Sequence, residues 1–188
     1  MSISVTRATL ADLMKHDGKA ELIDGRVVEI MPTGEQPGEV AENILTSLRA
    51  HVRATKRGKA HADGVGYAIP PLPVSGRESF CPDASYHEWP RAARPMRFVN
   101  GTPRFAAEVR SENDYGPAAE AEIAAKRDDY FEAGTLVVWD VDPLAREVRN
   151  WVRGASGPVV FMPGQVANAE PAVPGWTITV EDVFAEDP

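Results

Sequence analysis

Two acidic residues lie in apolar surroundings, where a carboxylate is rarely tolerated alone. Asp83 follows Pro82 at the start of a half-apolar stretch, and Glu108 lies inside the apolar residues 105–109. Buried carboxylates need a cation or a metal ion as a partner. Two of them on neighbouring strands could bind Mg²⁺, a hard ion that prefers oxygen ligands, and such an ion can activate water and stabilise charge on a phosphoryl group. The alternative interpretation, that each acid lies solvated at a strand end, stays open here.

A lysine on a predicted helix is the third candidate for chemistry. Ile123, Lys126 and Tyr130 are three and four residues apart, so they share one helix face. Ile123 and Tyr130 mark that face as the packed one. A lysine there either extends outward to solvent or meets a carboxylate. We predict that Lys126 points toward Asp83 and Glu108, because the same helix must cover the strands that carry them.

The first half of the chain supplies a short helix, a hairpin and a long helix. Residues 9–14 are typical of a capped helix. Asp24-Gly25 between apolar stretches predicts a hairpin over residues 21–30. Apolar residues at helical spacing from Val40 to Val52 predict one long amphipathic helix. Its basic end is either a solvated surface or a phosphate contact, and it comprises Arg49, His51, Arg53, Lys56, Arg57, Lys59 and His61.

The second half alternates strands with one further helix. Short strands are expected at residues 67–69, 83–86 and 105–109, with a loop rich in Pro and Arg at about 89–103. Pro117 and Gly134 bound a helix over about 118–133. Buried or paired strands follow at 136–141 and 147–152, and the last third consists of short strands. The order predicts a mixed α/β fold with one central sheet, in a single domain over residues 1–188.

The composition limits the function classes. The chain has 188 residues and a net charge of −8, which argues against a protein that coats nucleic acid and less strongly against a nuclease. The N-terminus has no apolar core of a signal peptide, and no apolar run approaches the roughly 20 residues of a membrane-spanning helix. With one cysteine, no internal disulfide forms. We therefore expect a cytoplasmic protein without a membrane partner.

The remaining candidates for metal or thiol chemistry are interpreted as structural. His16, His51, His61 and His87 have no metal-ligand spacing and are expected at the surface or in the basic region. Cys81 is expected to serve packing. Trp139 and Trp151 are interpreted as core aromatics.

Several short motifs in a fixed order resemble a known family across nearly the whole chain. They are Glu21-Leu22-Ile23-Asp24-Gly25, Pro82-Asp83, Glu108-Val109-Arg110-Ser111, Lys126-Arg127-Asp128-Asp129-Tyr130, Gly134 and Val138-Trp139-Asp140-Val141-Asp142-Pro143. In this order the chain resembles the Uma-type family of proteins assigned as restriction endonucleases, a branch of the PD-(D/E)XK nuclease superfamily.

The resemblance implies a restriction-endonuclease-like core, with a mixed central sheet flanked by helices. It implies that Asp83 and Glu108 bind Mg²⁺ or Mn²⁺ and that the catalytic lysine has moved from the strand to the helix, at Lys126. It makes Glu21 a fourth member of the catalytic site. The implied function is metal-dependent endonucleolytic hydrolysis of DNA. The alternative is a catalytically inactive interaction or scaffold protein on a nuclease fold, and a homodimer is left open.

The chain departs from the family pattern at two places. The usual superfamily lysine, two residues after the strand glutamate, is Arg110 here. Arginine stays protonated and does not act as a base, but it can stabilise phosphate charge. Many relatives carry a histidine at the start of the long helix, where this chain has Pro37-Gly38-Glu39.

Overall fold

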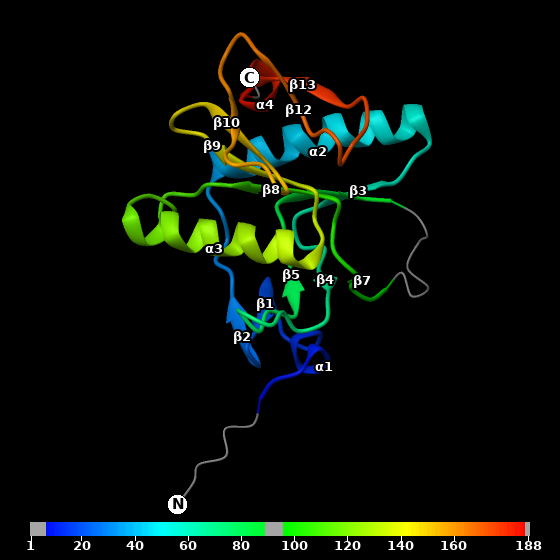
Figure 1. Cartoon of the computed structure of the whole chain (residues 1–188), viewed down its shortest axis with the longest axis vertical. Helices are drawn as coiled ribbons and strands as arrows, with labels where there is room; N and C mark the ends of the chain where they lie inside the picture. Colours follow the sequence, from blue (N-terminus) through cyan, green and yellow to red (C-terminus); the bar gives the residue numbers. More distant parts are fainter. Residues whose placement is uncertain (1–6, 89–95, 187–188) are drawn as a thin grey trace, which may run out of the picture.

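The computed structural model describes residues 7–88 and 96–186, and its centre is a six-stranded mixed sheet (Figure 1). The strand order is β11-β10-β9-β8-β6-β3. The central pair β8 and β9 is parallel, and the other neighbours are antiparallel. The strands are β3 (Lys59–Ala62), β6 (Ala84–His87), β8 (Phe105–Val109), β9 (Val137–Asp142), β10 (Glu147–Val152) and β11 (Val159–Phe161). The predicted mixed α/β architecture is confirmed.

The long helix α2 (Glu35–Thr55) covers one face of this sheet (Figure 1). The predicted amphipathic pattern is confirmed: Ile44 and Leu48 are completely buried, while Arg49 and Arg53 are exposed. Burial of an apolar stripe against a sheet is what stabilises such a helix in a protein. The core that this stripe joins contains Phe105, Val137, Trp139 and Trp176.

The basic end of α2 is shorter than predicted. The helix ends at Thr55, and Lys56 adopts the left-handed conformation that closes it. Gly58 also has a positive φ, of 64°, so the chain reverses within three residues. Lys59 and His61, which we expected at the end of the helix, therefore lie on strand β3.

Helix α3 (Pro117–Ala133) covers the opposite face of the sheet (Figure 1). Pro117 lies in its first turn and Gly134, with φ 112°, ends it, as the sequence predicted. Tyr130 is completely buried in a second core cluster with Ala106. Side chains alternate between the two faces of a strand. Glu108, two residues after Ala106, therefore lies on the α3 side of β8.

A smaller lobe, called the hairpin lobe below, packs beside α3 and is built from the first described elements of the chain. It consists of the short helix α1 and the β1–β2 hairpin, and a three-stranded sheet of order β5-β4-β7 lies next to it. The Asp24-Gly25 turn has positive φ at both residues, 48° and 69°, as a two-residue hairpin requires. The elements are α1 (Leu10–Leu13), β1 (Ala20–Ile23), β2 (Arg26–Glu29), β4 (Tyr67–Ala68), β5 (Ser79–Phe80) and β7 (Val99–Asn100). Of the predicted loop at 89–103, residues 89–95 lie outside the described residues.

The C-terminal segment folds over α2 with more helix than expected. It forms the β12 (Val166–Asn168) and β13 (Thr177–Thr179) hairpin and then the four-residue helix α4 (Val180–Val183). The indole of Trp176 donates to Ser47 of α2 at 3.0 Å. We predicted the short strands but not α4, whose single turn is too short for a helical period. Each helix within the described ranges 7–88 and 96–186 is too short or too polar to serve as a transmembrane span.

Candidate active site

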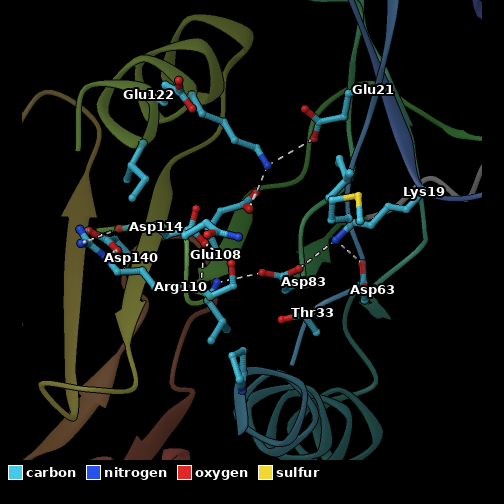
Figure 2. A pocket seen from close by; sticks show the side chains of 18 of the residues that line it. Lys19, Glu21, Thr33, Asp63, Asp83, Glu108, Arg110, Asp114, Glu122 and Asp140 are labelled. Carbon is cyan, nitrogen blue, oxygen red and sulfur yellow. Dashed lines mark hydrogen bonds and ion pairs between the residues drawn. The ribbon is translucent and has the colours of Figure 1, made fainter. Parts of the chain in front are cut away.

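A wide cavity opens where the hairpin lobe, the end of β8 and helix α3 meet (Figure 2). The start of α2 contributes Gln36 and Pro37 to its rim. Its volume of about 1580 Å³ exceeds the roughly 300–1,000 Å³ that is typical of small-molecule pockets. All four side chains singled out from the sequence line it, namely Glu21, Asp83, Glu108 and Lys126.

Glu108 is the central carboxylate of the cavity. Its Oε2 accepts a hydrogen bond from Nζ of Lys126 at 2.9 Å, and its Oε1 accepts one from the hydroxyl of Tyr130 at 2.6 Å. Burial raises the pKa of Glu108, and the nearby carboxylates of Asp83 and Glu21 raise it further. Lys126 opposes this shift without cancelling it, so the negative charge at Glu108 is only partly compensated.

Lys126 lies between two acids on the inner face of α3. Its Nζ is 3.3 Å from Oε1 of Glu21, in addition to its bond to Glu108. Burial disfavours the ammonium, but the attraction of Glu108 and Glu21 outweighs it and raises the pKa of Lys126. The side chain is therefore protonated at neutral pH, and it is directed inward as the helix period predicted.

Asp83 is fixed against the same strand that carries Glu108. Its Oδ2 accepts a hydrogen bond at 2.8 Å from the backbone N–H of Val109, the residue after Glu108. Its own N–H donates to the carbonyl of Ala107 at 3.1 Å. Asp83 and Glu108 thus lie at neighbouring strand ends and line one cavity. That their carboxyl groups lie within about 8 Å, close enough to share one ion, stays a prediction.

Glu21 connects the cavity to a buried ion-pair network. Its Oε2 pairs with Arg77, whose Nε contacts Oδ2 of Asp129 at 2.7 Å. Its Oε1 accepts the backbone N–H of Cys81 at 2.9 Å. Burial alone would raise the pKa of Glu21, but Lys126 and Arg77 reverse that effect and lower it. Glu21 is therefore held ionised, where it positions Lys126.

Three polar residues near this site, Lys19, Asp63 and Arg77, were not predicted from the sequence. Only Lys19 has a local sequence pattern that could have indicated it. Lys19 contacts Asp83 and Asp63, at 2.9 and 2.6 Å. At the start of β1 the apolar Ala20 and Leu22 alternate with Glu21 and with Lys19, the residue before the strand, so the alternation assigns both charged residues to one face. Arg77 has no comparable signal, because its partner Glu21 is 56 residues away.

Arg110 also lines the cavity, but two acidic side chains bind its guanidinium. Its Nε and Nη2 contact both carboxylate oxygens of Asp140, at 2.7 and 2.8 Å, and Nη2 contacts Glu120 at 3.0 Å. The guanidinium side chain is 3% exposed. The hydrogen bond to Asp140, followed by that to Glu120, raises the pKa of Arg110 further. Arg110 therefore joins β8, β9 and the start of α3.

The other predictions about single residues had mixed outcomes. His87 is buried, contrary to expectation, whereas His61 is half-buried; their rings stack, and His61 Nε2 lies 3.1 Å from His87 Nδ1. Burial and then His87 lower the pKa of His61 to about 4. Cys81 is buried, as expected, and Trp139 is a core residue. Trp151 is only half-buried, under Arg127.

The donor set of the cavity suits a hard divalent cation. Among residues 7–88 and 96–186, no three or more His, Cys, Asp or Glu side chains are grouped to hold a metal ion. Mg²⁺, however, is commonly bound by one or two carboxylates together with waters and substrate phosphates. Asp83 and Glu108 offer such a pair, and the raised pKa of Glu108 marks a negative charge that a dication would stabilise.

Comparison with known proteins agrees with this fold. The Uma2 family, described as "Putative restriction endonuclease", matches residues 8–181. A solved structure described as a "putative nuclease belonging to DUF820" from Anabaena variabilis ATCC 29413 superposes with a TM-score of 0.72. It is 18% identical, and the match covers 94% of this chain and 97% of that chain. No curated protein matches the chain. The expected nuclease-like fold is thereby confirmed.

Proposed function

Because the chain belongs to the Uma2 family, whose description is "Putative restriction endonuclease", we propose that it is a Mg²⁺- or Mn²⁺-dependent phosphodiesterase that cleaves DNA. One observation carries this proposal. The Lys126 ammonium lies between Glu108 and Glu21, in a cavity that also contains Asp83. Three predicted site residues and a fourth implied one thus converge from four separate segments. Restriction-endonuclease-like chemistry needs this combination of carboxylates and a cation beside the scissile phosphate.

The chain's own residues have distinct tasks in this proposal. Asp83 and Glu108 would hold the metal ion, which when bound supplies positive charge and a more acidic water. Lys126 is protonated, so it acts by orienting the attacking water or by neutralising charge on the phosphoryl oxygens. Glu21 holds the ammonium in place, and the Tyr130 hydroxyl fixes Glu108. Arg110 is left out, because two acids already bind its guanidinium.

The alternative is a scaffold protein that keeps the nuclease fold without catalysis. That function places no demand on Lys126, which could then extend into solvent. The inward position of the ammonium and the raised pKa of Glu108 favour the enzyme. The absence of the family histidine near Pro37 and the net charge of −8 are the features that favour the scaffold.

A cleavage assay separates the two functions. Purified protein is incubated with single-stranded, linear double-stranded and supercoiled DNA, with Mg²⁺, Mn²⁺ or EDTA. We expect cleavage that requires the divalent ion and is lost in Asp83→Ala. Lys15→Met is the matched control, because Lys15 is an exposed lysine of the hairpin lobe. Absence of cleavage with every substrate and ion, from folded protein, would favour the scaffold.

A further inference from the structure

We propose that Lys19 is a positioning residue that occupies Asp83 while the cavity is free of metal and transfers its ammonium fully to Asp63 when a divalent cation binds. This inference rests on the proposed function, because it assumes that Asp83 is a metal ligand. It adds a competing internal cation to that site and a second carboxylate that receives it.

The geometry places Lys19 between two carboxylates (Figure 2). Its Nζ lies 2.9 Å from Oδ1 of Asp83 and 2.6 Å from Oδ1 of Asp63. The two acids follow from the pairing of β3 with β6, in which Ala62 faces Ala84. Asp63 and Asp83 are the next positions beyond that last pair. Lys19, the residue before β1, therefore bridges the two acids at the end of this strand pair.

The two carboxylates are not equivalent. Asp83 is 18% exposed and has its Oδ2 fixed by the Val109 N–H, so Oδ1 is the oxygen to which Lys19 binds. Asp63 is 46% exposed and accepts the Gly64 N–H at 2.7 Å with the oxygen that contacts Lys19. A cation that binds Asp83 must compete with the ammonium for Oδ1. Asp63 makes that exchange feasible, because the displaced ammonium keeps a paired carboxylate.

The pKa of Lys19 agrees with a firmly held ammonium. Burial would lower it, but the attraction of Asp83 and Asp63 is stronger and raises it. The lysine thus remains a cation throughout, and it competes with the metal ion as a charge. If Lys19 served only to hold the hairpin lobe against the sheet, the opposite effect on metal affinity would be expected. Loss of Lys19 would then leave Asp83 less well placed, and Asp83 would bind metal more weakly.

Metal affinity tests the proposal directly. Calorimetric titration of the full chain with Mn²⁺, without DNA, is done for the wild type, Lys19→Met and Asp63→Asn. Loss of the competing ammonium should tighten binding about tenfold, as expected for one hydrogen bond to a charged group. Loss of the second carboxylate should weaken binding severalfold, because Lys19 then has only Asp83. The two substitutions are therefore expected to act in opposite directions.

Two control variants separate the effect of the Lys19 contacts from the effect of changing the net charge near the cavity. Glu122→Gln removes an exposed acid from the rim of the same cavity, and Lys15→Met removes a lysine from the hairpin lobe. Their effects on affinity should be smaller than those of Asp63→Asn and Lys19→Met and should fade in high salt. Thermal unfolding of each variant confirms that it is folded. Asp63→Asn keeps the test valid if Lys19→Met does not fold, because Asp63 is largely exposed.

The outcomes for this inference and for the proposed function are distinct. If Lys19→Met binds Mn²⁺ no more tightly than the wild type, or if Asp63→Asn matches Glu122→Gln, the exchange of Lys19 is wrong, even if DNA is cleaved. If neither the wild type nor Lys19→Met binds Mn²⁺, the inference also fails. If affinities shift as expected but no DNA is cleaved, Lys19 has the role inferred here and the nuclease function is wrong.

Discussion

Two charged networks flank the end of β8, and they differ in how completely their charges are paired. In the network of Arg110, one guanidinium binds the carboxylates of both Asp140 and Glu120. In the cavity, one ammonium at Lys126 serves both Glu108 and Glu21, and the pKa of Glu108 remains raised. In the first network the guanidinium side chain is 3% exposed between two acids, whereas in the second Lys126 does not fully offset the effect of burial and neighbouring carboxylates on Glu108. The number of ion pairs therefore does not identify the site, but incomplete compensation does.

The comparison predicts that the largest effect on cleavage comes from Lys126→Met. The substitution keeps much of the side-chain volume and removes the charge that faces the cavity. We expect cleavage of DNA to fall by about 100-fold or more, which is the scale for loss of one electrostatic stabiliser. The variant is expected to fold, because Met keeps the packing volume and Glu21 keeps Arg77 as a partner, and the rate is expressed per folded molecule measured by circular dichroism. Equal cleavage by this variant and the wild type would contradict the role of the helix lysine.

Arg110→Met should have the converse result. It leaves Asp140 buried without its bidentate partner, and breaking such a pair destabilises a protein by about 3 kcal/mol. Urea unfolding followed by circular dichroism measures the loss. The rate of cleavage per folded molecule should stay within a few-fold of the wild type. A catalytic defect at full stability would instead mean that the guanidinium contacts the substrate.

Arg110 also shows where sequence reasoning reaches its limit. The hairpin, the two long helices and the strands β6, β8, β9 and β10 were predicted, because they rest on local periods and on turn residues such as Gly25 and Gly134, whereas β3 and α4 were not. The inward face of α3 at Lys126 followed from the same periods. The partner of Arg110 on β9 was not predicted, because that contact depends on the parallel register that sets Glu108 opposite Asp140. Register between distant strands is a tertiary property without a local signal.

The same limit applies to the cavity. Asp83, Glu108, Lys126 and Glu21 were singled out, since each is a charged residue at a position that periodicity or family resemblance marks. The pairs of Lys19 with Asp83, and of Arg77 with Glu21, join residues more than 50 positions apart. Neither pair changes the local pattern of its own segment. The histidine pair was missed for the same reason, because His61 and His87 meet only through the pairing of β3 with β6.

Lys126→Arg sharpens the comparison by keeping the charge. A guanidinium in place of the ammonium retains the attraction to Glu108 and Glu21 but is planar and larger. If Lys126 acts mainly as a charge, cleavage should fall by only about tenfold, from the misplaced donor. A loss as large as that of Lys126→Met would show that the position of a compact ammonium, and with it the oriented water, is essential. Steady-state cleavage rates of the two variants, measured side by side, decide between these roles.

The smallest expected effect concerns the rim of the Arg110 network. Glu120 is half-exposed, and its hydrogen bond to Arg110 lowers its pKa below the ordinary value of 4.5. Because solvent screens the half-exposed Glu120 end, the pair contributes about 0.5 kcal/mol, so Glu120→Gln should lower the free energy of unfolding by about that amount at pH 7. Because the folded-state pKa is lowered, this contribution is present above pH 4.5 and is lost as the pH falls through the folded value. Unfolding curves of the wild type and variant should therefore converge in acid. A difference that persisted there would mean that the neutral side chain, and not the charge, supports Arg110.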